Sequence, residues 1–186
     1  MNVKSALALA QVSSLVVFGL AAVWYFVPWL RIQDRTRALT ALLWPHTFRY
    51  VALQVFAAQQ AGFPISDSAR DGILIGDLAG AVLALAAIAA LRSRARWSIW
   101  LAWALLLETG YDTVANVRAG IHEGLFGLAQ GVSWLVVAFY VPVIVVSLAL
   151  ISWQLWSRRH EALASEHDSA RRPLSASPGQ RVAARG

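Results

Sequence analysis

The chain has 186 residues, of which 58% are hydrophobic and only 14% are charged, and its formal net charge is +6. A soluble globular domain has about a quarter of its residues charged, so this composition excludes an ordinary water-soluble globule. The chain has no cysteine, which excludes a disulfide framework, a thiolate zinc site and a cysteine nucleophile.

The first apolar run, Ser5–Leu30, contains no charged residue and is long enough to cross a bilayer, which takes about 20 apolar residues in a helix. A cleaved signal peptide has an apolar region of only about 7–15 residues, so we expect an uncleaved anchor here. The next segment, Ala38–Ala61, is also long enough, but Pro45, His46 and Arg49 lie near its middle. We predict that it either spans the membrane or lies at the membrane surface as an amphipathic helix.

Three further apolar runs follow: Gly72–Leu91 contains one charged residue, Trp97–Val117 contains two, and Ala129–Trp156 contains none. Within lipid, only helices and closed barrels satisfy all backbone groups, and barrel strands would be shorter and alternating. The sequence therefore predicts an all-α, polytopic transmembrane helix bundle over residues 1–156, with five helices, or four plus one interfacial helix. Residues 157–186 contain six Arg and few large apolar side chains, and we predict a disordered, basic cytoplasmic tail.

The positions of the basic residues favour five crossings. Cytoplasmic loops next to membrane helices are rich in Lys and Arg. If Ala38–Ala61 spans the membrane, all three basic clusters fall on the cytoplasmic side, whereas four crossings would leave the first cluster outside. The clusters are Arg31, Arg35 and Arg37; Arg92, Arg94 and Arg96; and Arg158 and Arg159. We therefore expect a multi-pass inner-membrane protein with a cytoplasmic C-terminus. These basic residues flank helices, so we expect the lipid bilayer and no nucleic acid as a partner.

Small residues recur every four positions in the third apolar run, at Gly72, Gly76, Gly80 and Ala84. This spacing lines one stripe of a helix with residues that let two helix backbones approach closely. The stripe serves either helix packing within the bundle or a contact in a homo-oligomer or a larger membrane complex.

Polar side chains repeat at helical spacing in two of the predicted helices, and a third carries a single carboxylate, Asp77. Glu108, Asp112 and Asn116 are spaced four apart, so they share one face of a helix. His46, Tyr50 and Gln54 have the same spacing, with Arg49 at the edge of their face. Asp77 lies beside the stripe of small residues. Ionisable groups at membrane depth normally face the bundle interior and pair there. We predict a buried polar cleft in which Arg49 pairs with Glu108 while Asp77 and Asp112 lie close by. Its candidate ligand-binding residues are His46, Arg49, Tyr50, Gln54, Asp77, Glu108, Asp112 and Asn116.

Three functions remain open for such a cleft, beside a purely structural ion pair that fixes helix register. The first is a non-enzymatic protein that binds an amphiphilic ligand or acts as an accessory subunit. The second is a small oligomeric transporter or a proton or cation pathway. The third is an enzyme that acts on a membrane-dissolved substrate, with His46 or a carboxylate as acid or base. No motif for a nucleophile, a metal or a nucleotide is present, so we expect no catalytic residue, no metal and no cofactor.

Four short strings resemble a family of small bacterial integral membrane proteins without an assigned function. They are Trp44–Gln54, Ile75–Leu85, Tyr111–Asn116 and Tyr140–Pro142, and the resemblance covers Trp44 to Trp156. It implies a bacterial inner membrane and contributes no reaction, substrate or cofactor. The recurrent positions of that family match His46, Phe48, Arg49, Gly76, Asp77, Leu78 and Asp112. Glu108 has no clear counterpart, so the resemblance favours Asp77 or Asp112 as the partner of Arg49.

Overall fold

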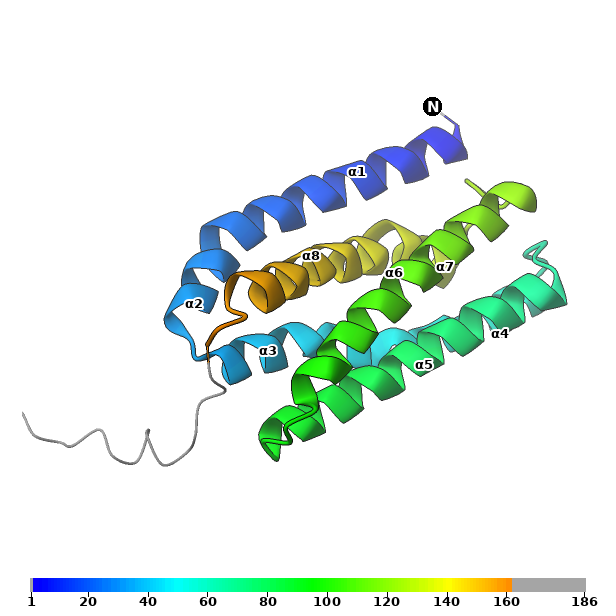
Figure 1. The fold of residues 1–186 in the computed structure, drawn as a ribbon. Helices are drawn as coiled ribbons and strands as arrows, with labels where there is room; N and C mark the ends of the chain where they lie inside the picture. The colour runs from blue at the N-terminus through cyan, green and yellow to red at the C-terminus, as the bar shows by residue number, and fades with distance from the viewer. Residues whose placement is uncertain (1, 162–186) are drawn as a thin grey trace, which may run out of the picture.

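Five helical rods, alternating in direction, form the bundle (Figure 1). A computed structural model describes residues 2–161, and within this range the chain has helices and no β-strand. The predicted all-α bundle of five helices is therefore confirmed, while the predicted tail after residue 161 lies outside the described residues. The rods consist of α1 (Val3–Ala21), η1 (Ala22–Phe26) and α2 (Val27–Ile32); α3 (Arg35–Thr47), η2 (Phe48–Leu53) and α4 (Gln54–Gln60); α5 (Asp67–Arg92); α6 (Ser98–His122); and α7 (Gly131–Leu135), η3 (Val136–Tyr140) and α8 (Val141–Ser157).

Because successive rods run in opposite directions, the loops between them lie at the two ends of the bundle (Figure 1). The amino end holds the start of α1, the loop 61–66 and the loop 123–130, and Gly127 lies directly against Lys4 there. The basic end holds the loops 33–34 and 93–97 and the end of α8. There, Arg35 Nη1 donates to the carbonyl of Glu161 at 2.9 Å. All three predicted basic clusters thus flank one end of the bundle.

The segment that was ambiguous in the sequence, residues 38–61, lies within the bundle as one of the five rods (Figure 1). Its backbone is α-helical up to Thr47 and forms the 3₁₀ helix η2 after the interior Pro45. Proline lacks the N–H that an α-helix needs at this point, and a 3₁₀ helix has only three residues per turn. The tighter turn makes every third residue point inward, and His46, Arg49, Ala52 and Val55 are all buried.

Three of the helical rods are long and apolar enough to cross a membrane: Val3–Ile32, Asp67–Arg92 and Gly131–Ser157. The first two contain the predicted runs Ser5–Leu30 and Gly72–Leu91, and the third overlaps most of the predicted run Ala129–Trp156 but begins at Gly131. The predicted span Trp97–Val117 lies in α6 except for Trp97, which caps it; α6 has 25 residues but is not one of these three.

Both terminal rods contain a π-helical turn just before a proline. Val27 N–H donates to the carbonyl of Ala22 ahead of Pro28, and Val141 N–H donates to the carbonyl of Val136 ahead of Pro142. In a π turn each carbonyl accepts from the N–H five residues later. The partner of the Val137 carbonyl would therefore be Pro142, which has no N–H. The Val137 carbonyl is therefore left for another partner, and the side chain of Gln11 in α1 donates to it at 3.4 Å.

The half of the bundle near the basic end is filled by aliphatic side chains. Thirteen buried residues from the second, third, fourth and fifth rods and from α2 form one core there. They include Leu30, Leu39 and Leu43, and also Ala84 at the end of the predicted stripe of small residues. Two smaller clusters, around Ala52 and Leu74 and around Leu7 and Ala138, lie in the half near the amino end.

Glu123 ties two loops together at the amino end. Its carboxylate accepts from the Ser66 amide at 3.0 Å and from the Ser66 hydroxyl, next to the start of α5, where the helix dipole favours an anion. The Ser66 hydrogen bonds hold the pKa of Glu123 below its ordinary value of 4.5. Ionised Glu123 therefore stabilises the fold above that ordinary value, and this contribution is lost as the pH falls through the lowered pKa.

We expect Glu123→Gln to lower the thermal midpoint by a small amount at neutral pH and not at all in acid. The wild-type protein and the variant are compared by thermal unfolding in detergent from neutral pH to well below 4.5. The two midpoints should converge as Glu123 becomes protonated, because both side chains are then uncharged. A difference that stays constant over this pH range would contradict the prediction.

Candidate functional site

The centre of the bundle holds one arginine that is bound by acids from two other helices. Arg49 in η2 is buried, with 2% of its surface exposed. Its Nε donates to Asp77 of α5 at 2.8 Å, its Nη1 donates to Glu108 of α6 at 2.8 Å, and its Nη2 donates to Asp112 of α6 at 2.5 Å. Nη1 also donates to the Thr109 hydroxyl at 2.8 Å. We call Arg49, Asp77, Glu108 and Asp112 the ion cluster.

The ion cluster contains more negative than positive charge. Its one guanidinium faces three carboxylates, which gives a formal charge of −2 when all three are ionised. A guanidinium has five N–H donors, and four hydrogen bonds to side chains already use most of them. One carboxylate oxygen, Glu108 Oε1, is buried without a hydrogen-bond partner in the described residues. The cluster is thus rich in acceptors and poor in free donors.

Two glycines of α5 make room for this cluster. A methyl group on Gly80 would overlap the Arg49 guanidinium, and one on Gly76 would overlap the Asp112 carboxylate. Gly72, in contrast, has open space where its side chain would be. The predicted stripe therefore has different roles along its length: Gly76 and Gly80 admit charged side chains, Ala84 joins the aliphatic core, and Gly72 makes no close approach.

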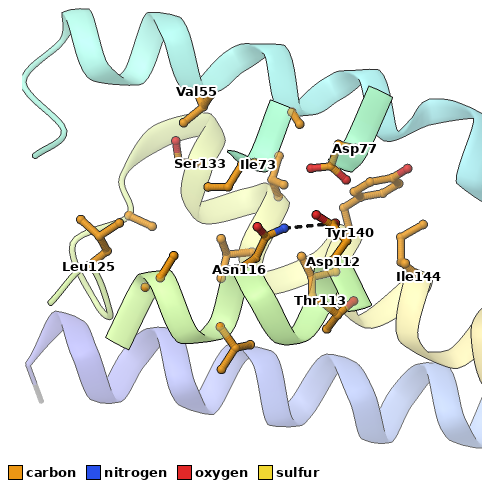
Figure 2. A pocket seen from close by; sticks show the side chains of 18 of the residues that line it. Val55, Ile73, Asp77, Asp112, Thr113, Asn116, Leu125, Ser133, Tyr140 and Ile144 are labelled. Carbon is orange, nitrogen blue, oxygen red and sulfur yellow. Dashed lines mark hydrogen bonds between the residues drawn. The ribbon is translucent and has the colours of Figure 1, made fainter. Parts of the chain in front are cut away.

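A cavity of about 280 Å³ leads from the ion cluster toward the amino end. Figure 2 shows it between Asp77, Asp112 and Tyr140 at one end and Leu125 at the other. Its walls come from all five rods and are mostly apolar, with Ile73, Val55 and Ile144 among them. The polar groups at its inner end include Arg49, Asp77, Asp112 and Asn116, and Asn116 Nδ2 donates to Asp112 Oδ2 at 3.1 Å.

Two hydrogen bonds between rods fix the position of the cavity walls. Tyr140, in the π turn η3, donates from its hydroxyl to the carbonyl of Pro45 at 2.7 Å. Ser133 of α7 donates from its hydroxyl to Gln54 Oε1 of α4 at 2.9 Å. The predicted site residue Gln54 therefore lines the cavity but uses its carbonyl oxygen to bind another rod.

Of the eight predicted site residues, three do not line the cavity. Glu108 is bound to Arg49 within the ion cluster, and Tyr50 and His46 lie elsewhere. Tyr50 is 52% exposed on the outside of the bundle, because the 3₁₀ turn removes it from the face that α-helical spacing assigns to it. His46, near the end of α3, is fully buried against α8, where its Nε2 lies 2.9 Å from the Ser147 hydroxyl. The same hydroxyl lies 2.9 Å from the carbonyl of Ile144, so His46 is tied to α8 rather than to the cavity.

Five polar residues that line the cavity were not predicted: Gln11, Thr109, Thr113, Ser133 and Tyr140. Thr109 follows Glu108 directly, and its hydroxyl lies near enough to accept from Arg49. Tyr140 precedes Pro142, and this spacing is the one available signal, because a proline within a long helix often alters the turn before it. Nothing in the sequence distinguishes Ser133 and Gln11 from other polar residues in apolar runs.

Comparison with known proteins places the chain in a family. A family model described as a domain of unknown function (DUF8737) matches residues 6–156, which is most of the chain and includes the whole ion cluster. No curated protein and no solved structure matches the sequence.

Proposed function

The chain belongs to the DUF8737 family, whose description assigns no chemistry, and we propose from the site alone that the protein binds an amphiphile within a membrane. The apolar tail of the ligand lies against the walls of the cavity, and its polar head meets the ion cluster. The observation that carries the proposal is this combination of a mostly apolar cavity with charged groups at its inner end. Ligand sites typically have such a form, with few polar groups in an apolar lining.

The outer surface of the bundle supports a membrane location. Large apolar side chains are exposed along the candidate membrane spans, among them Leu9, Val16, Trp24, Ile75 and Leu135. Water-soluble proteins rarely expose such continuous apolar surface. We propose five crossings of a bacterial inner membrane, with the basic end in the cytoplasm, because Lys and Arg accumulate next to helices on that side. The cavity then opens toward the opposite side.

A proton or cation pathway is the second candidate, since two carboxylates of the ion cluster line the cavity. The packing on the far side of the cluster argues against it. There the bundle is filled by the aliphatic core around Leu39, Leu43 and Leu105, whose side chains are fully buried. A charge that reached the cluster would meet an apolar barrier, so the geometry favours a binding site that is closed at its inner end.

We expect Thr113→Phe to remove the bound amphiphile by filling the cavity. Thr113 lines the cavity, and its hydroxyl bonds the Thr109 carbonyl of its own helix, so the change costs no bond between rods among residues 2–161. The protein is purified in a maltoside detergent, and the extracted amphiphiles are quantified by mass spectrometry. The wild-type protein should retain an amphiphile near stoichiometry, and the variant should retain about tenfold less, which corresponds to about 1.4 kcal/mol of binding free energy.

Val114→Phe is the matched control for this experiment. Val114 is the next residue of α6, but it is 68% exposed on the outer surface. The same aromatic ring there enlarges the lipid-facing surface without entering the cavity, so the retained amphiphile should equal that of the wild-type protein. An equal amphiphile content in wild-type protein and Thr113→Phe would refute binding in the cavity.

A further inference from the structure

We propose that the ligand of the cavity carries a cationic head, such as an alkylammonium group, and that this head lies against Asp77 and Asp112. The inference rests on the proposed function, because it names the chemical class of ligand for the same cavity. Three features of the site support it: the charge balance, the occupation of the Arg49 donors and the arrangement of groups at the inner end.

The charge balance favours a positive ligand. The ion cluster has three carboxylates for one guanidinium. Among the cavity-lining residues that the structure describes, Arg49 is the one cationic side chain. Charges interact more strongly in an apolar interior than in water, so the uncompensated carboxylates attract a cation and repel an anion.

The guanidinium of Arg49 does not serve as an anion receptor. Four of its hydrogen bonds go to Asp77, Glu108, Thr109 and Asp112, and each of its three nitrogens is engaged. A phosphate or carboxylate head would have to displace a carboxylate that is fixed on a neighbouring helix. The same head would then lie beside two further carboxylates, which is electrostatically unfavourable.

The groups at the inner end of the cavity suit an ammonium head. Asp77 and Asp112 come from α5 and α6 and both line the cavity, and the Tyr140 ring lies beside Asp77 (Figure 2). Each aspartate has a second carboxylate oxygen besides the one that binds Arg49, and an aromatic face also attracts a cation. The apolar walls beyond them, toward Leu125, take the alkyl chain.

Three probes with the same dodecyl chain test the class of the head: dodecylamine, dodecyl phosphate and 1-dodecanol. Binding of each labelled probe is measured with the protein in phosphatidylcholine nanodiscs, and Thr113→Phe nanodiscs provide the background from partition into lipid. At neutral pH the amine is an ammonium ion, as lysine is. We expect dodecylammonium to bind at least about tenfold more tightly than dodecanol and dodecyl phosphate to stay at background.

Asp77→Asn tests which group receives the head. This change keeps the shape of the side chain and an oxygen that accepts from Arg49, but it removes one negative charge. We expect the affinity for dodecylammonium to fall about tenfold and the affinity for dodecanol to stay the same, which also shows that the variant is folded. Asp71→Asn, on the same helix but exposed and paired with Arg70, should leave both affinities unchanged.

The outcomes separate the two proposals. If none of the probes binds above the Thr113→Phe background, the proposed amphiphile binding fails, and the cationic class fails with it. If dodecanol or dodecyl phosphate binds as tightly as dodecylammonium, the cavity binds amphiphiles but the cationic class is wrong. If Asp77→Asn keeps the full affinity for dodecylammonium, the head does not lie against Asp77.

Discussion

Arg49→Met is expected to cost about 3–5 kcal/mol of stability, because it leaves three carboxylates close together without their common cation. Arg49 joins the second, third and fourth rods through charged hydrogen bonds. A domain typically has a total stability of about 5–15 kcal/mol, so such a loss brings much of the protein close to unfolding. The measurement is the thermal midpoint in maltoside detergent, together with the monodisperse fraction in size-exclusion chromatography.

Two further variants show whether charge is the cause of this loss. Arg92→Met removes an exposed arginine at the end of α5 and should change the midpoint little. The second variant combines Arg49→Met with Asp77→Asn, Glu108→Gln and Asp112→Asn. It makes the whole cluster neutral and should recover most of the lost stability, because replacing an entire buried ion cluster costs far less than removing one partner. A wild-type midpoint for Arg49→Met alone would show that the cluster does not hold the helices together.

Gly80→Ala is expected to cost about 1–2 kcal/mol, although alanine normally stabilises a helix relative to glycine. The added methyl group would occupy the place of the Arg49 guanidinium and lie 2.9 Å from Glu108 Oε2. The guanidinium is the end of a long side chain, but its four hydrogen bonds prevent it from moving aside without losing some of them. Thermal unfolding in detergent measures the change, and Gly76→Ala, which meets Asp112, should act in the same direction.

Gly72→Ala is the control on the same helix and the same stripe. Nothing lies within 4 Å of its added methyl group, so only the helix propensity changes, and this favours alanine by about 1 kcal/mol. The midpoint should therefore rise slightly for Gly72→Ala and fall for Gly80→Ala. If all three glycine variants shift the midpoint in the same direction, the glycines do not make room for the ion cluster.

The helical rods and the charged residues on them follow from the sequence because both depend on local properties. Apolar runs such as Ser5–Leu30 and Ala129–Trp156 are long enough to predict helices without knowledge of their neighbours. The four-residue spacing of Glu108, Asp112 and Asn116 places them on one face of α6, and two of them line the cavity in the structure. The predicted pair of Arg49 and Glu108 is present at 2.8 Å.

The sequence was misleading where the helix changes its pitch. At α-helical spacing, Tyr50 belongs to the same face as His46 and Gln54, yet Tyr50 is exposed in the structure. The 3₁₀ helix η2 turns three residues per turn, so the inward positions become His46, Arg49 and Ala52. An interior proline indicates that the helix changes locally, but it does not indicate which kind of turn follows.

The sequence by itself determined the rods, their apolar surfaces and the acids that Arg49 needs, because periodicity and composition act within a single helix. Only the tertiary structure decided that one guanidinium takes all three carboxylates and that a cavity ends there. These features depend on how α5 and α6 lie against η2, and the charged side chains occupy the room that Gly76 and Gly80 leave. Contacts between helices far apart in the chain have no signature in local spacing.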